Sequence, residues 1–340
     1  MRSWIALRGN RGRLNMEPDL GEFELIRRFF LDPAAARRDS GVILGIGDDA
    51  ALLDLPKGAD LVASVDTIVA GRHFLTGADP RAIGHRALAV NLSDMAAMGA
   101  TPSWATLALT IPDADPLWLE KFAAGFLALA DEHAVALVGG DMTRGPLTIS
   151  VQILGHAPHG ASLRRSGAKA GDLLLVSGTL GDAGAGLAFR KTPPANRTAA
   201  VEALERRFDY PSPRVQLGIA ARGIATAAMD LSDGLVGDLP KLADASGIAA
   251  HVNVDQLPLS QAMRAAVNLS QARDWALAGG DDYELLLSVP PKRVAELARA
   301  ADQLNLTLTP IGELRAGAGV TWSLNGEDFV PGVSGYDHFA

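Results

Sequence analysis

The acidic residues of this chain stand in short segments that border glycine or close an apolar stretch, and this arrangement most constrains the fold. The segments are GIGDD (45–49), SVD (64–66), NLSD (91–94), GGD (139–141), DLSDG (230–234) and GGDD (279–282). A solvated charged surface would instead show Lys and Glu scattered at helical spacing. Carboxylates in apolar surroundings need a counter-charge or hydrogen-bond donors. The fold therefore has to supply partners for these carboxylates, and few lysines lie near the segments of the first half.

Apolar segments of strand length alternate with longer stretches of helical periodicity. In the first half, after a helical start at GEFELIRRFF, we expect strands at 61–66, 104–111, 134–141 and 147–157, and helices at 79–99 and 116–134. In the second half, we expect a Gly-rich turn at 181–186, helices near 197–207 and 213–225, and strands beside 230–235 and 279–289. This alternation predicts the α/β (α+β) class.

A polar, basic and Gly-containing stretch at 158–171 predicts the domain boundary. We therefore expect an N-terminal domain at 21–160 and a C-terminal domain at 161–340. Residues 1–20 carry Arg2, Arg8, Arg11 and Arg13, with the first acidic residue at Glu17, and we interpret them as a flexible basic extension.

Composition narrows the class of protein. The 340 residues are 48% hydrophobic and 21% charged, as expected for a globular chain of two domains. No apolar run approaches the roughly 20 residues that span a bilayer, so we expect no membrane segment. The net charge of −8 argues against a general nucleic-acid binder, and the absence of cysteine favours a reducing compartment such as the cytoplasm.

A hard divalent cation would supply the counter-charge that the acidic segments need. Short Asp side chains suit a compact site of oxygen ligands, and Asn91 and Asp94 lie one turn apart on the expected helix at 79–99. A calcium sensor is the non-enzyme alternative, but counting from Asp230 the fifth position of an EF-hand loop is Gly234 rather than an acid or amide. Acids this far apart in the sequence converge only through the fold, as in a catalytic metal cluster.

Phosphate binding requires backbone N–H groups and positive charge. The segment GDAGAGLA can open a helix whose free N–H groups face an anion. Cationic side chains lie near the expected boundary, namely Arg144, Arg164, Arg165 and Lys169. The Walker, protein-kinase and GxSxG motifs are all absent, so phosphoryl transfer here would use another scaffold.

Nine motifs follow one another along the chain: GIGDDAALL, SVDTIVAGRHF, ALAVNLSDMAAMGA, GGDMTRGPL, LRRSGAKAGD, GDAGAGLA, DLSDGL, GGDDYELL and GYDHF. In sequence and in order they resemble the motifs of the thiamine-monophosphate kinase family. The resemblance covers about residues 21–339. The resemblance implies the two-domain fold of aminoimidazole ribonucleotide synthetase, and a homodimer formed through the N-terminal sheet. It also implies ATP-dependent phosphorylation of thiamine phosphate to thiamine diphosphate, with several Mg²⁺ ions as cofactor.

The resemblance also implies roles for individual residues. The positions that match magnesium ligands or stand beside them are Asp49, Ser64, Val65, Asp66, Asp94, Asp141, Asp230 and Asp233. Those that match contacts to ATP are Gly140, Asp141, Arg165 and Ser232, and those that match contacts to thiamine phosphate are His73, Asp281 and Tyr336. We assign the catalytic role to Asp49, Asp94 and Asp233, and a supporting role to Asp48.

Two positions depart from the family pattern. The family usually has GGEDYE where this chain has GGDDYE, so Asp281 is one methylene shorter than the usual Glu. Met142 stands where Thr is usual. Other ATP-dependent enzymes of the same fold remain the alternative, although selenophosphate synthetase and the carbamoyl-dehydrating hydrogenase-maturation protein normally need a cysteine that this chain lacks.

Clustered carboxylates would repel the phosphates of ATP and thiamine phosphate unless Mg²⁺ lies between them. Phosphoryl transfer depends on in-line positioning and charge neutralisation rather than on covalent help from protein. We therefore expect direct transfer to the substrate phosphate, with no covalent phospho-enzyme.

Overall fold

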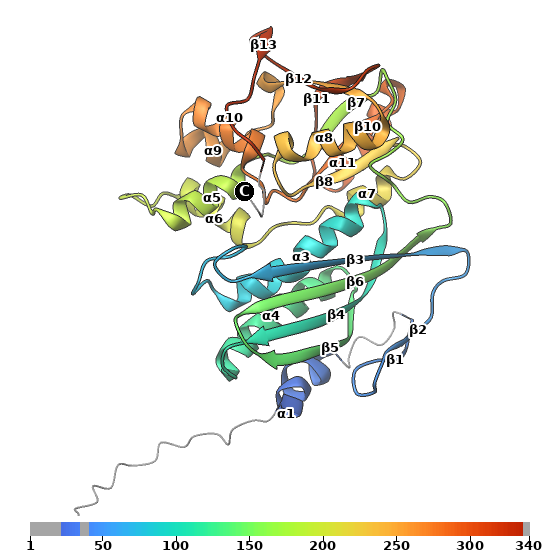
Figure 1. The fold of residues 1–340 in the computed structure, drawn as a ribbon, viewed down its shortest axis with the longest axis vertical. Helices are drawn as coiled ribbons and strands as arrows, with labels where there is room; N and C mark the ends of the chain where they lie inside the picture. Colours follow the sequence, from blue (N-terminus) through green and yellow to red (C-terminus); the bar gives the residue numbers. More distant parts are fainter. Residues whose placement is uncertain (1–21, 35–40, 336–340) are drawn as a thin grey trace, which may run out of the picture.

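Two large β-sheets, accompanied by a small two-stranded one, organise the described part of the chain (Figure 1). In this computed structural model, residues 22–34 and 41–335 are described. The first sheet has the strand order β3-β6-β4-β5, and the second has the order β13-β12-β9-β11-β7-β10-β8. This is the mixed α/β architecture that the alternating pattern predicts.

The first sheet consists of β3 (Ala59–Val69), β4 (Thr101–Ile111), β5 (Ala136–Arg144) and β6 (Thr148–Pro158). Its helices are α3 (Pro80–Ala97) and α4 (Pro116–Glu132), which lie together behind the sheet in Figure 1. The two helices pack closely because each has glycine at the contact. A Cβ on Gly84 would lie 2.1 Å from the carbonyl oxygen of Phe122, and one on Gly125 would lie 2.0 Å from that of Arg81.

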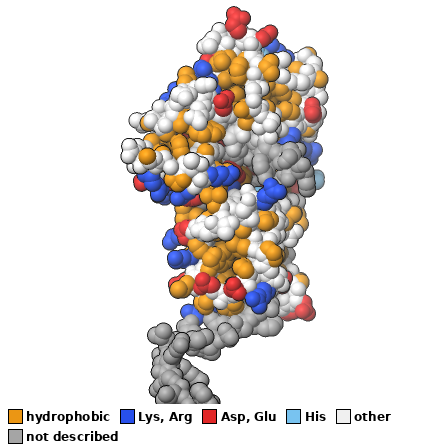
Figure 2. Space-filling view, turned by 60° about the vertical axis from the view of Figure 1, so that its left-hand side comes forward, with side chains coloured by type: hydrophobic (Ala, Val, Ile, Leu, Met, Phe, Trp, Pro, Cys, Tyr) orange, Lys and Arg blue, Asp and Glu red, His pale blue; other side chains and the backbone are white. Residues whose placement is uncertain are grey.

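The second sheet consists of β7 (Leu173–Ser177), β8 (Ala227–Leu231), β9 (Ala249–Asn253), β10 (Glu284–Val289), β11 (Leu308–Arg315), β12 (Gly319–Leu324) and β13 (Glu327–Phe329). Its helices are α5 (Asp182–Lys191), α6 (Ala199–Asp209), α7 (Val215–Ala221), α8 (Leu235–Ser246), α9 (Gln261–Ala266), α10 (Leu269–Ala278) and α11 (Val294–Gln303), with 3₁₀ turns at η3 (Val254–Gln256) and η4 (Pro291–Arg293). Figure 1 shows this part above the first sheet, and Figure 2 shows Lys and Arg side chains gathered at the level where the two parts meet.

Short elements precede the first sheet. They are α1 (Glu22–Ile26), a π-helical turn η1 (Arg27–Leu31), α2 (Asp32–Ala34) and the hairpin of β1 (Val42–Leu44) and β2 (Leu52–Leu53). The helical start expected at GEFELIRRFF is therefore confirmed, and its Phe29 and Phe30 are buried. The expected extension at 1–20 lies outside the described residues.

Helix α3 lies at the centre of the molecule. Its apolar side chains are almost fully buried, and it contacts β3, β4 and β6 of the first sheet as well as β8 and β10 of the second. Leu88, Leu92 and Met95 have no exposed surface. A helix that is apolar on nearly every side is typical of a position enclosed by protein. Among the described helices, none is long and apolar enough to cross a membrane.

Three expected boundaries were wrong. The strand expected to end at Asp66 continues to Val69 in β3, so Asp66 lies inside an edge strand. The strand expected at 134–141 is β5 at Ala136–Arg144, so the GGD segment at 139–141 lies inside the strand rather than at its end. The segment at 181–186 is the first turn and a half of α5 rather than a loop. In each case, pairing or packing with distant segments extends the strand or helix through a short acidic motif that, taken locally, predicts a turn or the end of a strand.

Candidate functional site

Three carboxylates from three elements form the centre of the site, and we call Asp66, Asp94 and Asp230 the acidic cluster. Asp66 is on β3, Asp94 is on α3 and Asp230 is on β8, so the cluster spans both sheets. The Ser64 hydroxyl donates a hydrogen bond to Asp94 Oδ2. Alternation along β3 places Ser64 and Asp66 on the side that faces α3, while Val65 between them is 62% exposed on the opposite face.

Helix α3 holds the cluster through two further polar side chains. The Ser93 hydroxyl donates to Asp230 Oδ2 at 2.7 Å, and Asn91 Oδ1 accepts from the backbone N–H of Asp66 at 3.1 Å. The Asn91 amide in turn donates to the carbonyl of Ala87 at 3.0 Å. The three polar residues of NLSD therefore serve three different partners.

Burial and mutual repulsion raise the pKa values in the acidic cluster. Burial, followed by the charge of Asp94, raises the pKa of Asp66 to about 6. Burial, followed by the same charge of Asp94, raises the pKa of Asp230 to about 7. Burial also raises the pKa of Asp94, against the hydrogen bond from Ser64 and the charge of Arg165. A bound cation would reverse each of these effects.

A cavity of about 340 Å³ opens on the acidic cluster. Ser64, Asp94 and Asp230 line it, and Arg165 contributes a cationic side chain to the same wall. Arg165 comes from the connection between the two sheets, and its carbonyl accepts a 2.8 Å hydrogen bond from the Ser246 hydroxyl. Carboxylates beside one arginine suit a ligand that carries both a metal ion and phosphates.

The turn after β8 forms a second polar group. The backbone N–H groups of Ser232 and Asp233 both donate to Asp238 Oδ2, at 3.0 and 2.9 Å. Lys241 Nζ donates to Asp233 at 2.7 Å and to Asp238 at 2.9 Å. The Asp233 carboxylate thus has a lysine as its partner in this structure, and Asp238 fixes the turn that carries it.

Asp281 is held at the junction between α3 and the second sheet. Arg86 on α3 forms an ion pair with its Oδ1, and the Tyr283 hydroxyl donates to the same oxygen at 3.1 Å. The backbone N–H of Asp281 donates to the carbonyl of Ser232 at 2.8 Å, so this residue lies next to the turn after β8.

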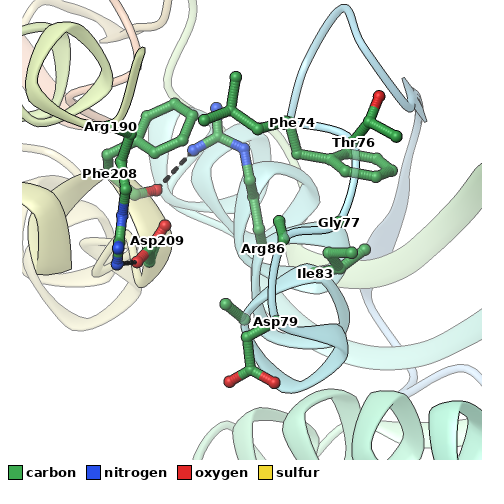
Figure 3. A pocket seen from close by; sticks show the side chains of 12 residues that line it. Phe74, Thr76, Gly77, Asp79, Ile83, Arg86, Arg190, Phe208 and Asp209 are labelled. Carbon is green, nitrogen blue, oxygen red and sulfur yellow. Dashed lines mark hydrogen bonds and ion pairs between the residues drawn. The ribbon is translucent and has the colours of Figure 1, made fainter. Parts of the chain in front are cut away.

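A second cavity, of about 260 Å³, lies beside Arg86 (Figure 3). Phe74 and Phe208 supply aromatic surface, Ile83 supplies an aliphatic side chain, and Asp79 and Arg86 are charged. The Arg86 guanidinium donates to the Phe208 carbonyl at 2.7 Å and stacks 4.5 Å from the ring centroid of Phe208. An apolar cavity with a few charged groups suits an aromatic organic ligand.

The structure separates Asp141 from the acidic cluster. Across the first sheet, Asp66 pairs with Val151, Val151 with Leu107, and Leu107 with Gly140, which precedes Asp141. Three strand spacings of about 4.8 Å put Gly140 and Asp141 roughly 14 Å from Asp66. Gly140 and Asp141 instead line a groove with Ile26, Phe30 and Ile46, which belong to segments that precede the sheet.

The remaining predicted residues lie elsewhere or outside the described part. Asp48 and Asp49 are exposed, and Asp48 Oδ1 accepts a 2.8 Å hydrogen bond from the backbone N–H of Asp49. His73 Nδ1 accepts from the backbone N–H of Val69 at 3.0 Å. Tyr336 lies outside the described residues.

The residues near the cavity fit a magnesium site only in part. Within the described residues, no group of three His, Asp or Glu side chains is arranged to hold a metal ion. The donors themselves are suitable, since Asp66, Asp94 and Asp230 offer carboxylate oxygens, and a bound cation would offset the burial that raises their pKa values. Asp94 and Asp230 together with the Ser64 hydroxyl therefore form a partial site that further ligands have to complete.

The expectation that the start of α5 binds an anion was wrong. The backbone N–H of Gly181 donates to Asp282 Oδ2 at 2.7 Å, so a carboxylate of the chain already lies there. Asp182 in the first turn accepts from Thr179 and Ser260, each at 2.7 Å. Two buried carboxylates at this end leave no place for a phosphate.

Sequence reasoning missed three polar residues of the site: Arg86, Asp238 and Lys241. Arg86 is a cation within an otherwise apolar stretch of the expected helix at 79–99, and it precedes Asp94 by two helical turns. That position was a usable signal, because a buried charge requires a partner. Asp238 and Lys241 follow DLSDG at a spacing that an exposed helix would also show, so they carried no such signal.

Two family models match consecutive parts of the chain. The family description "AIR synthase related protein, N-terminal domain" matches residues 47–157, and "AIR synthase related protein, C-terminal domain" matches residues 169–324. Thiamine-monophosphate kinase of Salmonella typhimurium is 47% identical over 94% of this chain and 98% of the relative. The same enzyme of Escherichia coli K12 is 46% identical, with the same two coverages.

Solved structures extend the similarity to three dimensions. Thiamine-monophosphate kinase from Stenotrophomonas maltophilia superimposes with a TM-score of 0.83 at 45% identity, over 88% of this chain and 97% of that one. A structure of AaThiL complexed with AMPPCP and TMP superimposes with a TM-score of 0.74 at 31% identity, over 96% of this chain and all of that one. The hydrogenase maturation protein HypE of E. coli, at 22% identity and a TM-score of 0.73, shares the fold alone.

Proposed function

Because this chain belongs to the thiamine-monophosphate kinase family, we propose that it transfers the γ-phosphoryl group of ATP to thiamine phosphate, giving thiamine diphosphate and ADP. The observation that carries the proposal is the acidic cluster. Two of its members, Asp94 and Asp230, line a cavity whose wall also contains Arg165. Clustered carboxylates with raised pKa values serve phosphoryl transfer when cations and phosphates lie between them. A relative of the same family has been solved with AMPPCP and TMP bound, which supports the same pair of ligands here.

The charged residues of the acidic cluster and its cavity would have different roles in this reaction. Asp66, Asp94 and Asp230 would hold Mg²⁺, which when bound neutralises phosphate charge and acts as a Lewis acid. Asp49, Asp141 and Asp233 would complete the ligand set, with the Ser64 hydroxyl and the Val65 carbonyl beside it. Arg165 is placed to pair with a phosphate oxygen, since it lines the same cavity as Asp94. Ser232 and Gly140 would contact the nucleotide.

The acceptor would lie toward Arg86 and Asp281. The cavity of Figure 3 offers aromatic walls for an organic ring system, and the carboxylate of Asp281 lies at the junction next to it. His73 precedes Phe74, which lines that cavity. We assign His73, Asp281 and Tyr336 to thiamine phosphate on this basis and on the family resemblance. The phosphate of the acceptor is itself the nucleophile, so the reaction requires no covalent phospho-enzyme and no strong general base.

A homodimer would supply the proposed metal ligand Asp141, which within one chain lies roughly 14 Å from Asp66. The face of the first sheet away from α3 carries exposed Leu61 and Val65, which are 56% and 62% exposed. Asp141 shares a row with Ala108, Ser150 and Thr67, which alternation places on this open face. A second copy packed on the open face would cover the apolar side chains and bring its own Asp141 toward the acidic cluster. We therefore propose a dimer whose two sites each use residues of both subunits.

Direct product analysis tests the function. The protein is incubated with thiamine phosphate, ATP and Mg²⁺, and the products are separated by chromatography. We expect thiamine diphosphate and ADP in equal amounts, and neither when Mg²⁺ is removed with EDTA. ADP without thiamine diphosphate would contradict the proposal. The chain contains no cysteine, which suits the reducing cytoplasm where we propose that the enzyme works.

A further inference from the structure

Arg86 is almost completely buried but lacks a full set of hydrogen bonds. Its side chain is 3% exposed, and its Nε has no hydrogen-bond partner among the residues that the structure describes. Its terminal nitrogens donate to the Phe208 carbonyl at the end of α6 and to Asp281. A buried guanidinium costs free energy unless its charge is matched, and Asp281 is the carboxylate with which it pairs. One side chain on α3 therefore ties together two segments of the second part of the chain.

Asp281 receives both of its side-chain hydrogen bonds on one oxygen. Arg86 and the Tyr283 hydroxyl donate to Oδ1, whereas Oδ2 has no partner in the described part of the chain. The Asp281 side chain is 26% exposed, so this second oxygen remains accessible to a ligand. Burial, followed by the charge of Asp281, raises the pKa of Tyr283 well above its usual value, so its hydroxyl remains a donor.

The backbone around Asp281 is strained. Asp281 has φ of +60° and Tyr283 has φ of +51°, both in the left-handed region that non-glycine residues rarely adopt. Each such residue costs on the order of 1 kcal/mol and persists only when its surroundings determine it. The contacts that hold this turn include the two hydrogen bonds to Oδ1, together with backbone bonds from the Asp281 N–H to the Ser232 carbonyl at 2.8 Å and from the Tyr283 N–H to the Leu231 carbonyl at 2.9 Å.

Helix α3 also carries Asp94 of the acidic cluster, eight residues after Arg86. At a rise of 1.5 Å per residue, the two positions lie about 12 Å apart along one rigid helix. The same helix thus sets the position of the phosphate-binding cavity and of Asp281.

We infer that Arg86 and Tyr283 are positioning residues that clamp Asp281, so that its free Oδ2 binds the organic part of the acceptor at a fixed distance from the acidic cluster. This inference rests on the proposed function, in which Asp281 contacts thiamine phosphate. Arg86 also lines the cavity of Figure 3, so the kinetic test has to separate its effect through Asp281 from a direct contact with the substrate.

Steady-state kinetics test the clamp with the single variants Tyr283→Phe, Arg86→Met and Asp281→Asn and with the double variant Arg86→Met/Asp281→Asn. Tyr283→Phe removes one donor and leaves the packing of the ring, and Arg86→Met removes the other. We expect each to raise KM for thiamine phosphate by about 10-fold or more, the equivalent of one hydrogen bond to a charged group, with kcat and KM for ATP changed less than about 2-fold. Arg86→Met in an Asp281→Asn background should add less than about 2-fold, because the residue through which it acts is already lost. Equal effects in both backgrounds, or a Tyr283→Phe enzyme with unchanged KM, would overturn the inference.

A matched control and a second measurement separate the clamp from the fold and from the function. Arg222→Met is the matched control, because Arg222 is a partly buried arginine that also has a nitrogen without a hydrogen-bond partner among the described residues. Arg222 forms no hydrogen bond with Asp281 and lines neither cavity, so this variant should leave KM unchanged. Amide hydrogen exchange of the substrate-free protein should be faster at 280–284 in Arg86→Met and Tyr283→Phe, and unchanged in Arg222→Met. Absence of thiamine diphosphate from the wild-type reaction would refute the proposed function, whereas unchanged exchange at 280–284 would refute the clamp whatever the reaction is.

Discussion

The Ser93 hydroxyl on α3 donates a 2.7 Å hydrogen bond to Asp230 on β8, and this contact joins the two halves of the molecule at the acidic cluster. Its neighbour Asp94 accepts a hydrogen bond from Ser64 on β3. The site therefore exists only when both sheets are packed against α3. Changes to this group should affect catalysis and stability in ways that can be separated.

Asp94→Asn should abolish turnover without unfolding the protein. The substitution keeps the volume and the hydrogen bond from Ser64 but removes the charge that a metal ion requires. We expect kcat to fall by at least about 100-fold, as for loss of one charged group that stabilises the transition state. Asp113→Asn is the control, because Asp113 is an exposed partner of Arg144 on the surface. A melting temperature like that of the wild type, with full activity in Asp94→Asn, would rule out the metal assignment.

Asp230→Asn should stabilise the metal-free protein at alkaline pH. Burial raises the folded-state pKa of Asp230 to about 7, from 3.8 for an ordinary Asp carboxyl group. The folded state thus binds the proton more tightly than the unfolded state, so the stability that this proton contributes is present below pH 4 and lost as pH rises to about 7. In EDTA at pH 8, the variant should exceed the wild type by roughly 2–4 kcal/mol in free energy of unfolding, measured with urea.

Two conditions control that measurement. The advantage of Asp230→Asn should shrink as pH falls from about 7 to about 4, because the wild-type carboxyl group then binds its proton. Millimolar Mg²⁺ at pH 8 should stabilise the wild type more than the variant. A wild type that remains the more stable protein in EDTA at pH 8 would contradict the raised pKa.

Glu284→Ala should destabilise the fold strongly. Glu284 is fully buried at the start of β10, where it accepts from Ser177 at 2.6 Å and from two arginines, Arg207 and Arg214. Removing one side of a buried ion pair leaves the other charges uncompensated, which costs about 3–5 kcal/mol. Urea unfolding measures this loss, with the exposed Glu120→Ala as control. A loss below about 1 kcal/mol would show that solvent reaches the two arginines.

Mixing two inactive variants should restore activity if each site uses both subunits. In a hybrid dimer of Asp94→Asn and Asp141→Asn subunits, one of the two sites has both wild-type residues. Random exchange makes half of the dimers hybrid, so about a quarter of the wild-type rate should return after unfolding and refolding the mixture. Each variant refolded alone is the control. No recovery, with light scattering showing dimers, would place Asp94 and Asp141 in the same subunit's site.

The three acidic residues of GGDDYE show which features of the site the sequence predicts and which it does not. The motif marks Asp281, Asp282 and Glu284 as unusual, yet each has a different partner: Arg86, the backbone N–H of Gly181, and the pair Arg207 and Arg214. The sequence alone cannot distinguish these roles, because each of these four partners lies at least 70 residues away along the chain.

The sequence by itself determined the class of fold, the family and the helix that carries Asp94. Local periodicity predicted α3 as residues 79–99, close to its observed bounds of Pro80–Ala97, because an apolar helix of this length depends on short-range pattern. Only the tertiary structure decided which acids meet. It placed Asp66, Asp94 and Asp230 together and Asp141 three strands away, since strand order and register arise from long-range pairing that no local motif encodes.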